Sequence, residues 1–570
     1  MRKKAHLKAH IIIIHQDTPL RGTTDGRKCR LKLIGTAGPV ESKIPGGAGH
    51  TRYRYCRLSP PDELLWLAKF DGLNLKPLLL PDCINSTPSR TETAERGTSP
   101  AHMARLLTAF LLLVNSLTAF ELGVRGVGIS ARSSPRTPLP QLVATPAKPA
   151  AKPAFDPAAF DKVVMKTYGR FSLVVSHGQG CYLFDDKGKK YLDCAAGIAT
   201  CCLGHADERL IKAVTEQMRE VNHVSNLYYI PQQGELAQRL VDSSCADRAF
   251  FCNSGAEANE AAIKLARRHA ITKLGAKRPV IITALNSFHG RTLATITATG
   301  QAKYQKNFGY GGKMVEGFEY VPYNDVAALK KMVARINGGF FSRLFRRGRK
   351  VAAIMMEPLQ GEGGITPATT EFYRAARELC DATGALLMAD EVQTGMGRTG
   401  EFWGYMKHGI EVDVFTTAKA LGGGVPIGAM CCKESANVFG PGDHASTFGG
   451  NPLACAAGNA VMKAFEEDNV LANVNARGEQ LRAGLRALVA TYPGVIKEVR
   501  GWGLIVGCEL EEACGFAAAD VVAKLMENGM LTVPAGPRVV RFVPPLVISE
   551  AEVNEAIDKF GAALKILSAK

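Results

Sequence analysis

The chain has 570 residues, of which 46% are hydrophobic, so it is long enough for several domains with sizeable cores. Its net charge of +17 is concentrated near the start: residues 1–160 carry 23 Lys and Arg against 11 Asp and Glu, which leaves 47 against 42 for residues 161–570. The nearly neutral remainder gives no general reason to expect a nucleic-acid partner, and no apolar run predicts a membrane span in the mature protein.

The first 155 residues are expected to precede the folded body. Residues 1–102 lack a sustained helical or strand period, which predicts a disordered extension or a spurious start of the gene model. Residues 103–155 begin with a basic residue and a short apolar core, MARLLTAFLLLVNSLTAF, and end in an acid-free stretch rich in Ala and Pro. This order is typical of a signal segment followed by a transit segment, so we expect import into the plastid (chloroplast stroma). The mitochondrial matrix and a disordered interaction arm are the alternatives.

The 15 cysteines show no spacing typical of a metal site, so no metal is expected. The doublets Cys201–Cys202 and Cys431–Cys432 lie in apolar stretches and are expected in the core. We infer a reducing compartment and no structural disulfides. A basic run at residues 343–350, within an apparent insertion, is predicted to be a solvated loop, the alternative being a contact of a basic binding protein.

From Phe160 onward, short apolar runs alternate with helix-like stretches, which predicts an α/β protein with a largely parallel sheet. Ligands in open α/β sheets bind at the carboxyl ends of the strands, so the polar or glycine-rich loops after the apolar runs form the candidate site. Five such runs are residues 250–252, 280–284, 351–356, 385–389 and 412–415.

The first of these runs leads into NSGAEANEAAIKLARR, residues 253–268. Gly255 lets the backbone approach a ligand closely, and the free N–H groups at the start of the following helix favour an anion such as a phosphate. The Ser254 hydroxyl can add a further donor. The alternative is an ordinary helix cap, because most such turns serve only that purpose.

Asp390 and Lys419 follow the fourth and fifth runs. Asp390 comes after five apolar or small residues, where a carboxylate needs a strong partner to stay charged, for instance a protonated pyridine nitrogen; the alternative is a helix cap. Lys419 lies between Ala418 and a glycine-rich loop, and an apolar setting lowers the pKa of a lysine. Such a lysine can form a Schiff base with an aldehyde and then transfer a proton, whereas the alternative is a surface lysine.

Seven motifs along the chain resemble, in the same order, those of the class III aminotransferases of fold type I. They are FFCNSGAEANEAAIKLAR, SFHGRTLATITATGQ, EPLQGEGGI, ADEVQTGMGRTG, TTAKALGGGVPIGA, STFGGNPLACAAG and VVRFVPPLVI, within a resemblance that covers about residues 166–567. The resemblance implies a pyridoxal 5'-phosphate cofactor and an α/β fold. A large domain with a mostly parallel seven-stranded sheet would cover residues 206–462, and a smaller α+β domain would combine residues 156–205 and 463–570. Residues 495–510, which alternate around Trp502, are expected to form strands.

The resemblance also implies which residues hold the cofactor. Lys419 would form the Schiff base, and Asp390 would act with it in catalysis by keeping the pyridine nitrogen protonated. Phe288 would stack on the ring, and Gln393 would bond the ring hydroxyl. Thr447 would reach the phosphate of the neighbouring subunit, which implies a homodimer with shared active sites. The implied cofactor-binding set is Ser254, Gly255, Ala256, Phe288, Asp390, Glu391, Val392, Gln393, Lys419 and Thr447.

For the substrates, the resemblance places Arg291 on the carboxylate of N2-acetyl-L-ornithine and Ser446 against the substrate. Arg541 would bind the α-carboxylate of glutamate or 2-oxoglutarate, and Glu362 would pair with Arg541 in between. The implied reaction moves the terminal amino group of acetylornithine to 2-oxoglutarate, giving N-acetylglutamate 5-semialdehyde and L-glutamate, a step of arginine biosynthesis. Ornithine δ-aminotransferase or another class III ω-aminotransferase is the alternative, although ornithine enzymes usually have Trp where His289 stands.

Overall fold

The computed structural model describes residues 10–12, 67–69, 155–338 and 348–569, and the chain divides into two compact units, residues 1–144 and 145–570. In the first unit, β1 (His10–Ile12) pairs antiparallel with β2 (Leu67–Lys69). The rest of the predicted extension and nearly all of the predicted targeting segment lie outside the described residues, so both stay predictions.

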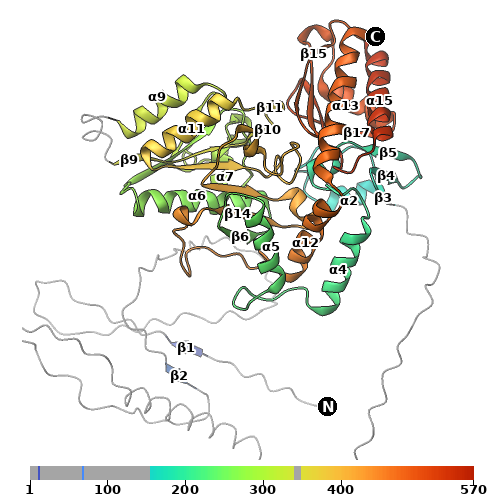
Figure 1. Cartoon of the computed structure of the whole chain (residues 1–570). Helices are drawn as coiled ribbons and strands as arrows, with labels where there is room; N and C mark the ends of the chain where they lie inside the picture. The colour runs from blue at the N-terminus through green and yellow to red at the C-terminus, as the bar shows by residue number, and fades with distance from the viewer. Residues whose placement is uncertain (1–9, 13–66, 70–154, 339–347, 570) are drawn as a thin grey trace, which may run out of the picture. The chain divides into compact units, whose positions relative to one another are not determined.

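A seven-stranded sheet forms the centre of the second unit (Figure 1). Six of its strands run in one direction, and β14 is antiparallel to its two neighbours. The expected mostly parallel sheet is confirmed, and the five apolar runs form β6, β7, β9, β12 and β13; the sequence did not indicate β8 and β14. The strand order is β6 (Arg248–Cys252), β14 (Gly428–Cys432), β13 (Val414–Thr417), β12 (Leu386–Asp390), β9 (Arg349–Met356), β7 (Arg278–Ala284), β8 (Phe318–Val321).

Alternate residues of the central strands pack against helices on opposite sides of this sheet. In β12, Leu387 and Ala389 belong to the cluster that contains residues of α9 (Val326–Asn337) and α11 (Thr370–Thr383), whereas Leu386 and Met388 belong to the cluster of α6 (Gly255–Thr272). Figure 1 shows α9 and α11 over one face of the sheet and α6 under the other. A strand buried on both faces is a continuous apolar run, which is why these strands were recognisable.

Two four-stranded sheets lie at the other end of this unit. In one, the parallel pairing of β5 with β17 joins the N-terminal and C-terminal segments; its strands are β17 (Met530–Leu531), β5 (Lys190–Asp193), β4 (Tyr182–Asp185) and β3 (Val175–Gln179). The other contains β15 (Ile496–Trp502), β16 (Ile505–Leu510), β19 (Val539–Phe542) and β18 (Val533–Pro534), so the strands expected around Trp502 are present. The unit is not divided further, and the domain boundaries at residues 205 and 462 stay predictions.

The remaining elements connect and cover these sheets. The helices are α2 (Pro157–Val163), α3 (Ala196–Ala199), α4 (Glu208–Glu220), α5 (Pro231–Asp242), α7 (Leu293–Ala298), α8 (Ala302–Gln305), α12 (Pro452–Glu467), α13 (Val470–Thr491), α14 (Ala518–Glu527) and α15 (Glu550–Ser568). A short ribbon pairs β10 (Leu359–Gln360) with β11 (Thr366–Pro367), and 3-10 turns cover Gly404–His408, Lys419–Gly422, Glu434–Ala436 and Glu512–Cys514.

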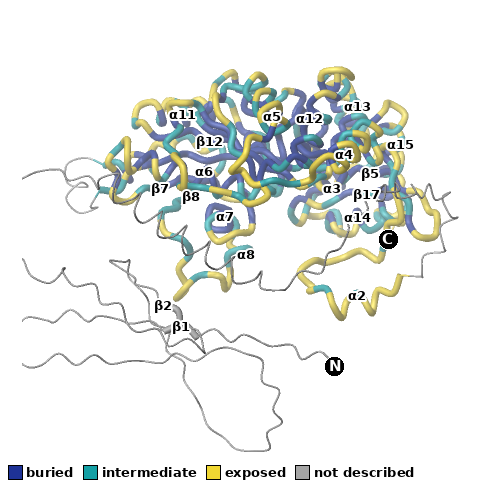
Figure 2. The backbone as a smooth tube through the Cα atoms, turned by 90° about the horizontal axis from the view of Figure 1, so that it is seen from below, coloured by how far each residue is buried: buried dark blue, intermediate teal, exposed yellow. Residues whose placement is uncertain are grey.

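Buried residues fill the interior between sheet and helices, while exposed residues lie on the outer helix faces (Figure 2). The described cysteines are free thiols, and Cys202, Cys431 and Cys432 are buried as expected. The expectation is wrong for Cys201, which is half-buried, because a turn of left-handed residues at positions 196–199 carries it away from the core. In the described residues, no helix is long and apolar enough to cross a membrane. The same residues contain no group of three or more His, Cys, Asp or Glu side chains that could hold a metal ion.

The basic run at residues 343–350 is only partly described, because residues 339–347 lie outside the described ranges. Arg349 and Lys350 begin β9, and Arg349 pairs with Glu319 at 2.5 Å. The prediction of a solvated loop is therefore wrong for these two residues, which the neighbouring strands and Glu319 hold in the sheet.

Candidate active site

A cavity of about 440 Å³ lies at the carboxyl ends of the parallel strands of the central sheet. The loops that follow β6, β7, β9, β12 and β13 all contribute to its wall, as the fold class predicts. The sequence-predicted residues that line it are Ser254, Gly255, Ala256, Phe288, Arg291, Asp390, Val392, Gln393 and Lys419.

Helix α6 begins at the wall of this cavity. Ser254 caps the helix, because its Oγ accepts a hydrogen bond from the backbone N–H of Glu257 at 3.3 Å. Gly255 is needed for a close approach: a Cβ at this position would lie 2.6 Å from Cγ1 of Val392. The free N–H groups and the dipole of a helix N-terminus attract anions, so the start of α6 can hold a phosphate group.

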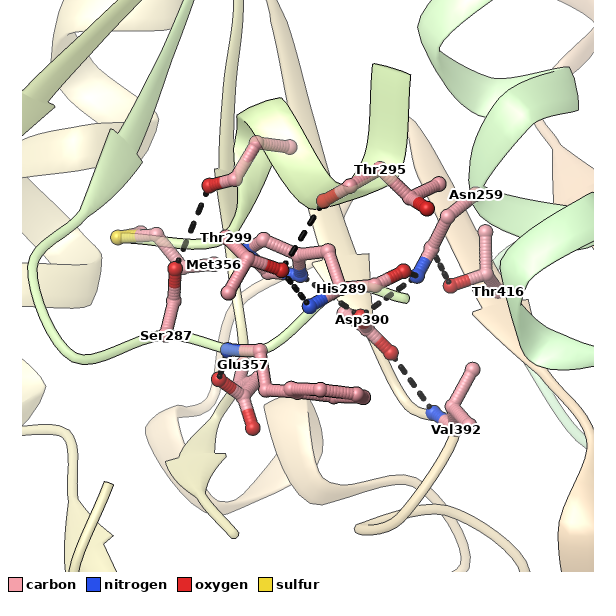
Figure 3. Close-up of polar contacts among 12 residues, drawn as sticks. Asn259, Ser287, His289, Thr295, Thr299, Met356, Glu357, Asp390, Val392 and Thr416 are labelled. Atoms are coloured by element: carbon pink, nitrogen blue, oxygen red, sulfur yellow. Dashed lines mark hydrogen bonds and ion pairs between the residues drawn. The ribbon is translucent and has the colours of Figure 1, made fainter. Parts of the chain in front are cut away.

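Asp390, the last residue of β12, is a buried carboxylate held by three neighbours (Figure 3). Its Oδ2 accepts a hydrogen bond from Asn259 Nδ2 at 2.8 Å and lies 2.8 Å from His289 Nδ1. Its Oδ1 accepts a hydrogen bond from the backbone N–H of Val392 at 3.0 Å. Hydrogen bonds of this kind stabilise the charged form of a carboxylate. The cavity wall thus carries a fixed negative charge that can pair with a cationic ring nitrogen.

Asn259 and His289 are site residues to which sequence reasoning gave no role in holding Asp390. Asn259, on α6, also donates to the backbone oxygen of His289 at 2.8 Å and accepts a hydrogen bond from the Thr416 hydroxyl at 2.7 Å. Figure 3 shows Asn259 from α6 and His289 from the loop after β7 meeting Asp390, while Thr416 from β13 meets Asn259. Because the three positions lie far apart in the sequence, only the folded sheet brings them together.

Glu357 is a second buried carboxylate at the cavity, and sequence reasoning missed it. Its two carboxylate oxygens accept hydrogen bonds from the backbone N–H groups of Phe288 and Gly361, each at 3.0 Å. Burial raises the pKa of Glu357 to about 7. The signal was present in the sequence, since Glu357 directly follows the apolar run of β9. Its contact with the Phe288 backbone fixes the loop that presents the Phe288 ring to the cavity.

Lys419 follows Ala418 after β13 and lines the cavity. Its backbone has a φ of 43°, in the left-handed region. Burial, with a smaller contribution from the positive charge of Arg541, lowers its pKa to about 8. A lysine with this pKa is partly neutral near pH 8, and only the neutral amine is a nucleophile or a base. The sequence-based expectation of a depressed lysine pKa therefore agrees with the structure.

Arg541, on β19 of the neighbouring sheet, meets Gln393 of the cavity wall and also Glu362. Its Nη1 lies 2.8 Å from Glu362 Oε1 and donates to Gln393 Oε1 at 3.0 Å and to the backbone oxygen of Gly361 at 2.9 Å. Arg541 is buried, while the Glu362 side chain is 23% exposed. The structure thus brings together the ion pair that the motifs implied, and Gln393 faces Arg541 from the cavity wall.

Arg291 is exposed at the cavity and lies over two aromatic rings. Its guanidinium carbon is 4.1 Å from the centre of the Tyr304 ring and 5.5 Å from that of Phe288. Contacts of this kind hold a guanidinium in place without neutralising its charge. The position leaves Arg291 able to receive an anionic group at the cavity.

Five sequence-predicted residues do not line the cavity: the ion pair of Arg541 and Glu362 next to Gln393, and Ser446, Thr447 and Glu391. Ser446 Oγ accepts hydrogen bonds at 3.1 Å from Asn253 Nδ2 and from the backbone N–H of Gly449. Thr447, next to it, is exposed. Glu391 is buried behind the cavity wall, where Tyr405 donates its backbone N–H at 2.8 Å and Thr394 its hydroxyl at 2.5 Å.

Comparison with known proteins agrees with this arrangement. Residues 163–564 match the family model described as aminotransferase class III. The chain is 56% identical over 420 residues to an acetylornithine aminotransferase of Nostoc sp., covering 74% of this chain and 96% of that protein. It is 57% identical over 417 residues to the acetylornithine aminotransferase of Thermosynechococcus vestitus, covering 73% and 98%.

Solved structures with the same fold include the N-acetylornithine aminotransferase of Stenotrophomonas maltophilia, at 38% identity and a TM-score of 0.60, covering 70% of this chain and 98% of that one. The ornithine aminotransferase of Toxoplasma gondii, with partial occupancy of PLP at its active site, matches at 32% identity and a TM-score of 0.67, covering 72% and 94%. The chain belongs to the class III aminotransferases and has the α/β architecture of fold type I.

Proposed function

We propose that this protein transfers the terminal amino group of N2-acetyl-L-ornithine to 2-oxoglutarate, giving N-acetylglutamate 5-semialdehyde and L-glutamate. The observation that carries the proposal is the identity of 56% to an acetylornithine aminotransferase over 96% of that protein's length. The site is consistent with it, since the cavity contains a lysine whose pKa is lowered and Arg291, and Arg541 lies against Gln393 of the cavity wall.

The residues of the cavity fit pyridoxal 5'-phosphate. The N-terminus of α6 would hold the phosphate, Phe288 the ring face, Asp390 the protonated ring nitrogen, and Lys419 the aldehyde carbon. The buried Asp390 carboxylate, which needs a cationic partner, is the structural observation behind this fit. When bound, this cofactor supplies an electron sink for the electrons left behind when a substrate carbon loses its proton.

Lys419 supplies the proton transfer. Because burial lowers its pKa to about 8, a large share of the amine is neutral near that pH and can accept a proton from the substrate carbon. The same group can return the proton to a neighbouring carbon, since it is held beside the cavity by the short turn Lys419–Gly422. Asp390 is held in position by Asn259 and His289.

The ion pair between Arg541 and Glu362 accounts for two different substrates in one cavity. While Arg541 and Glu362 are paired, their charges offset each other. This suits the terminal amine of acetylornithine, because no carboxylate lies beside that amine. When Glu362 moves away, Arg541 offers a planar fork of donors to the α-carboxylate of glutamate or 2-oxoglutarate. Arg291 would hold the distant carboxylate in both cases.

Steady-state rates of the purified protein on four amine donors test the proposal, with 2-oxoglutarate as the acceptor. We expect kcat/KM to be highest for acetylornithine and lower for succinylornithine, ornithine and 4-aminobutyrate. A preference for free ornithine would replace the proposal with an ornithine δ-aminotransferase, the second candidate, which the likeness to the Toxoplasma gondii enzyme favours.

We also propose that the protein acts as a homodimer in which Thr447 of each subunit completes the other's phosphate site. Thr447 is exposed beside large apolar side chains that are poorly covered: Leu227 is 86% exposed, Tyr228 69% and Phe448 59%. Asn226 Nδ2 donates to the backbone oxygens of Ser446 and Gly449, so these two exposed segments are neighbours. Exposed apolar patches of this kind mark protein interfaces.

Light scattering should give the mass of a dimer, and a monomeric, fully active protein would contradict this.

For localisation, we propose that residues 103–155 direct import into the plastid. The support is the order of a short apolar core followed by an acid-free stretch. A fluorescent fusion of residues 103–160 should enter the plastid, and a mitochondrial or cytosolic signal would overturn the assignment.

A further inference from the structure

Glu357 connects two segments of the site that lie far apart in the sequence. This buried side chain lines the cavity directly after β9. One of its carboxylate oxygens accepts the backbone N–H of Phe288, in the loop after β7, and the other accepts the backbone N–H of Gly361, directly after β10. A single carboxylate thus holds the loop that carries the Phe288 ring and the turn that leads into Glu362.

The backbone of Gly361 is held on three sides. Its N–H donates to Glu357, and its carbonyl oxygen accepts a hydrogen bond from Arg541 Nη1 at 2.9 Å. Gln393 packs against it so closely that a Cβ at this position would collide with the Gln393 side chain. Glu362 follows directly and pairs with Arg541 at 2.8 Å. The backbone from which the Glu362 side chain starts is therefore fixed next to its arginine partner.

Loss of the Glu357 carboxylate would leave two backbone N–H groups at the cavity without their acceptors. An unpaired N–H group in a water-poor site is costly, so the peptide before Gly361 should turn toward another acceptor. That turn would carry the Gly361 carbonyl oxygen away from Arg541 and shift the start of Glu362. The carboxylate can therefore influence the ion pair without touching either of its members.

Glu391 provides a comparison within the same chain. It is also a buried carboxylate that accepts a backbone N–H, in this case from Tyr405 at 2.8 Å, and its second partner is the Thr394 hydroxyl. Neither of these partners lines the cavity. Burial alone therefore does not distinguish the two carboxylates, and the contacts of Glu357 with Phe288 and Gly361 do.

We propose that Glu357 is a positioning residue that sets the geometry of the ion pair between Arg541 and Glu362, and through it the balance between the two amine donors. By holding Gly361, the carboxylate keeps Glu362 close enough to offset the charge of Arg541 while the terminal amine of acetylornithine is bound. The effect on substrate choice rests on the proposed function, whereas the hold on the Gly361 backbone does not.

The first test uses Glu357→Met in the full-length, cofactor-loaded protein, because methionine keeps the length of the side chain and removes both carboxylate oxygens. Assays at about pH 8 keep most of the wild-type side chain ionised, since burial raises the pKa of Glu357 to about 7. We expect the ratio of kcat/KM for acetylornithine to that for glutamate to fall roughly fivefold. Equal losses in both half-reactions would show a purely structural role and overturn the proposal.

A double variant tests whether Glu357 acts through the ion pair. If it does, Glu357→Met combined with Glu362→Gln should give the same ratio as Glu362→Gln alone. Effects that multiply would overturn the coupling. Tyr323→Phe is the matched control, because it removes a hydrogen bond of 2.6 Å to the backbone oxygen of Glu357 and leaves the carboxylate in place. It should keep the wild-type ratio, and a change as large as that of Glu357→Met would assign the effect to the strand end instead.

Amide hydrogen exchange, resolved to single residues by mass spectrometry, measures the hold on Gly361 without turnover. In the wild type, the Gly361 and Tyr405 amides should both exchange slowly, because each donates to a buried carboxylate. In Glu357→Met, Gly361 should exchange at least roughly tenfold faster while Tyr405 stays unchanged. Equal acceleration at both amides would overturn a specific hold.

Two outcomes in the wild type alone are also decisive. Fast exchange at Gly361 in the wild type would overturn the proposal even if Glu357→Met does not fold. A wild type that does not turn over acetylornithine would refute the proposed function and leave the exchange result standing.

Discussion

The two sides of the cavity hold their charges in different ways. Asp390, on the cofactor side, has a side chain that is 4% exposed and accepts hydrogen bonds from groups fixed by the central sheet and α6. Glu362, on the substrate side, is 23% exposed and pairs with Arg541 from a separate sheet. Breaking the first arrangement leaves a buried charge without its partners, whereas opening the second lets the partly exposed Glu362 meet water while Arg541 keeps its hydrogen bonds to Gln393 and the Gly361 backbone. The cavity thus combines one permanent charge with one adjustable ion pair.

The largest effect is expected from Lys419→Ala, which removes the base from the fixed side of the cavity. Turnover should fall by roughly a thousandfold or more, because Lys419 is the only lysine among the described residues that line the cavity. The near-visible absorbance of the bound cofactor should also change. Stopped-flow and steady-state assays measure both, and a variant that retains a tenth of the activity would exclude Lys419 as the catalytic base.

Asp390→Asn keeps the shape of the side chain and removes its charge. We expect turnover to fall on the order of a hundredfold, because a preorganised charge at the cofactor nitrogen is lost while the fold is retained. The neighbouring buried carboxylate provides the matched control: Glu391→Gln alters a group that faces Thr394 and Tyr405 instead of the cavity. Similar losses in both variants would show that stability, and not the position of the charge, is being measured.

The fold of the central sheet was largely predictable, and the exceptions have physical causes. Strands β9, β12 and β13 are buried on both faces and therefore form unbroken apolar runs. Strand β8 is a short edge strand whose sequence FEYV is only partly buried. Strand β14 follows a glycine-rich loop, which obscured its start.

The candidate site was predictable where one residue carries the chemistry in its local context. Asp390 and Lys419 both follow apolar runs, and that context alone suggested a perturbed acid and a perturbed amine. The partners of Asp390 could not be found in this way, because Asn259 lies 131 residues away and acts only through the packing of α6 on the sheet. Glu357 also directly follows an apolar run, residues 351–356, so the same sequence pattern predicts a buried carboxylate there.

Glu362→Gln tests the adjustable side. Loss of the carboxylate removes the negative charge that offsets Arg541, so the cavity should favour dicarboxylic substrates in both half-reactions. We expect the ratio of kcat/KM for acetylornithine to that for glutamate to fall roughly tenfold, equivalent to about 1.4 kcal/mol. Separate half-reaction rates measure this ratio. Glu479→Gln, which removes an exposed partner of Arg482 on α13, is the control and should leave the ratio unchanged.

The smallest expected effect concerns stability and separates Glu391 from Asp390. Burial raises the pKa of Glu391 from 4.5 to about 7, so between these pH values the folded chain keeps a proton that the unfolded chain has lost. Stability contributed by this group is therefore full below pH 4.5 and declines as the pH rises through about 7.

Glu391→Gln removes this dependence. Relative to the wild type, its free energy of unfolding should rise by roughly 3 kcal/mol from pH 5 to pH 8. Denaturant titrations at both pH values measure it, with the exposed Glu401→Gln as a control that should show little change. A flat difference for Glu391→Gln would mean that Thr394 and Tyr405 already stabilise the charged carboxylate, and the fixed side of the cavity would then contain two permanent charges.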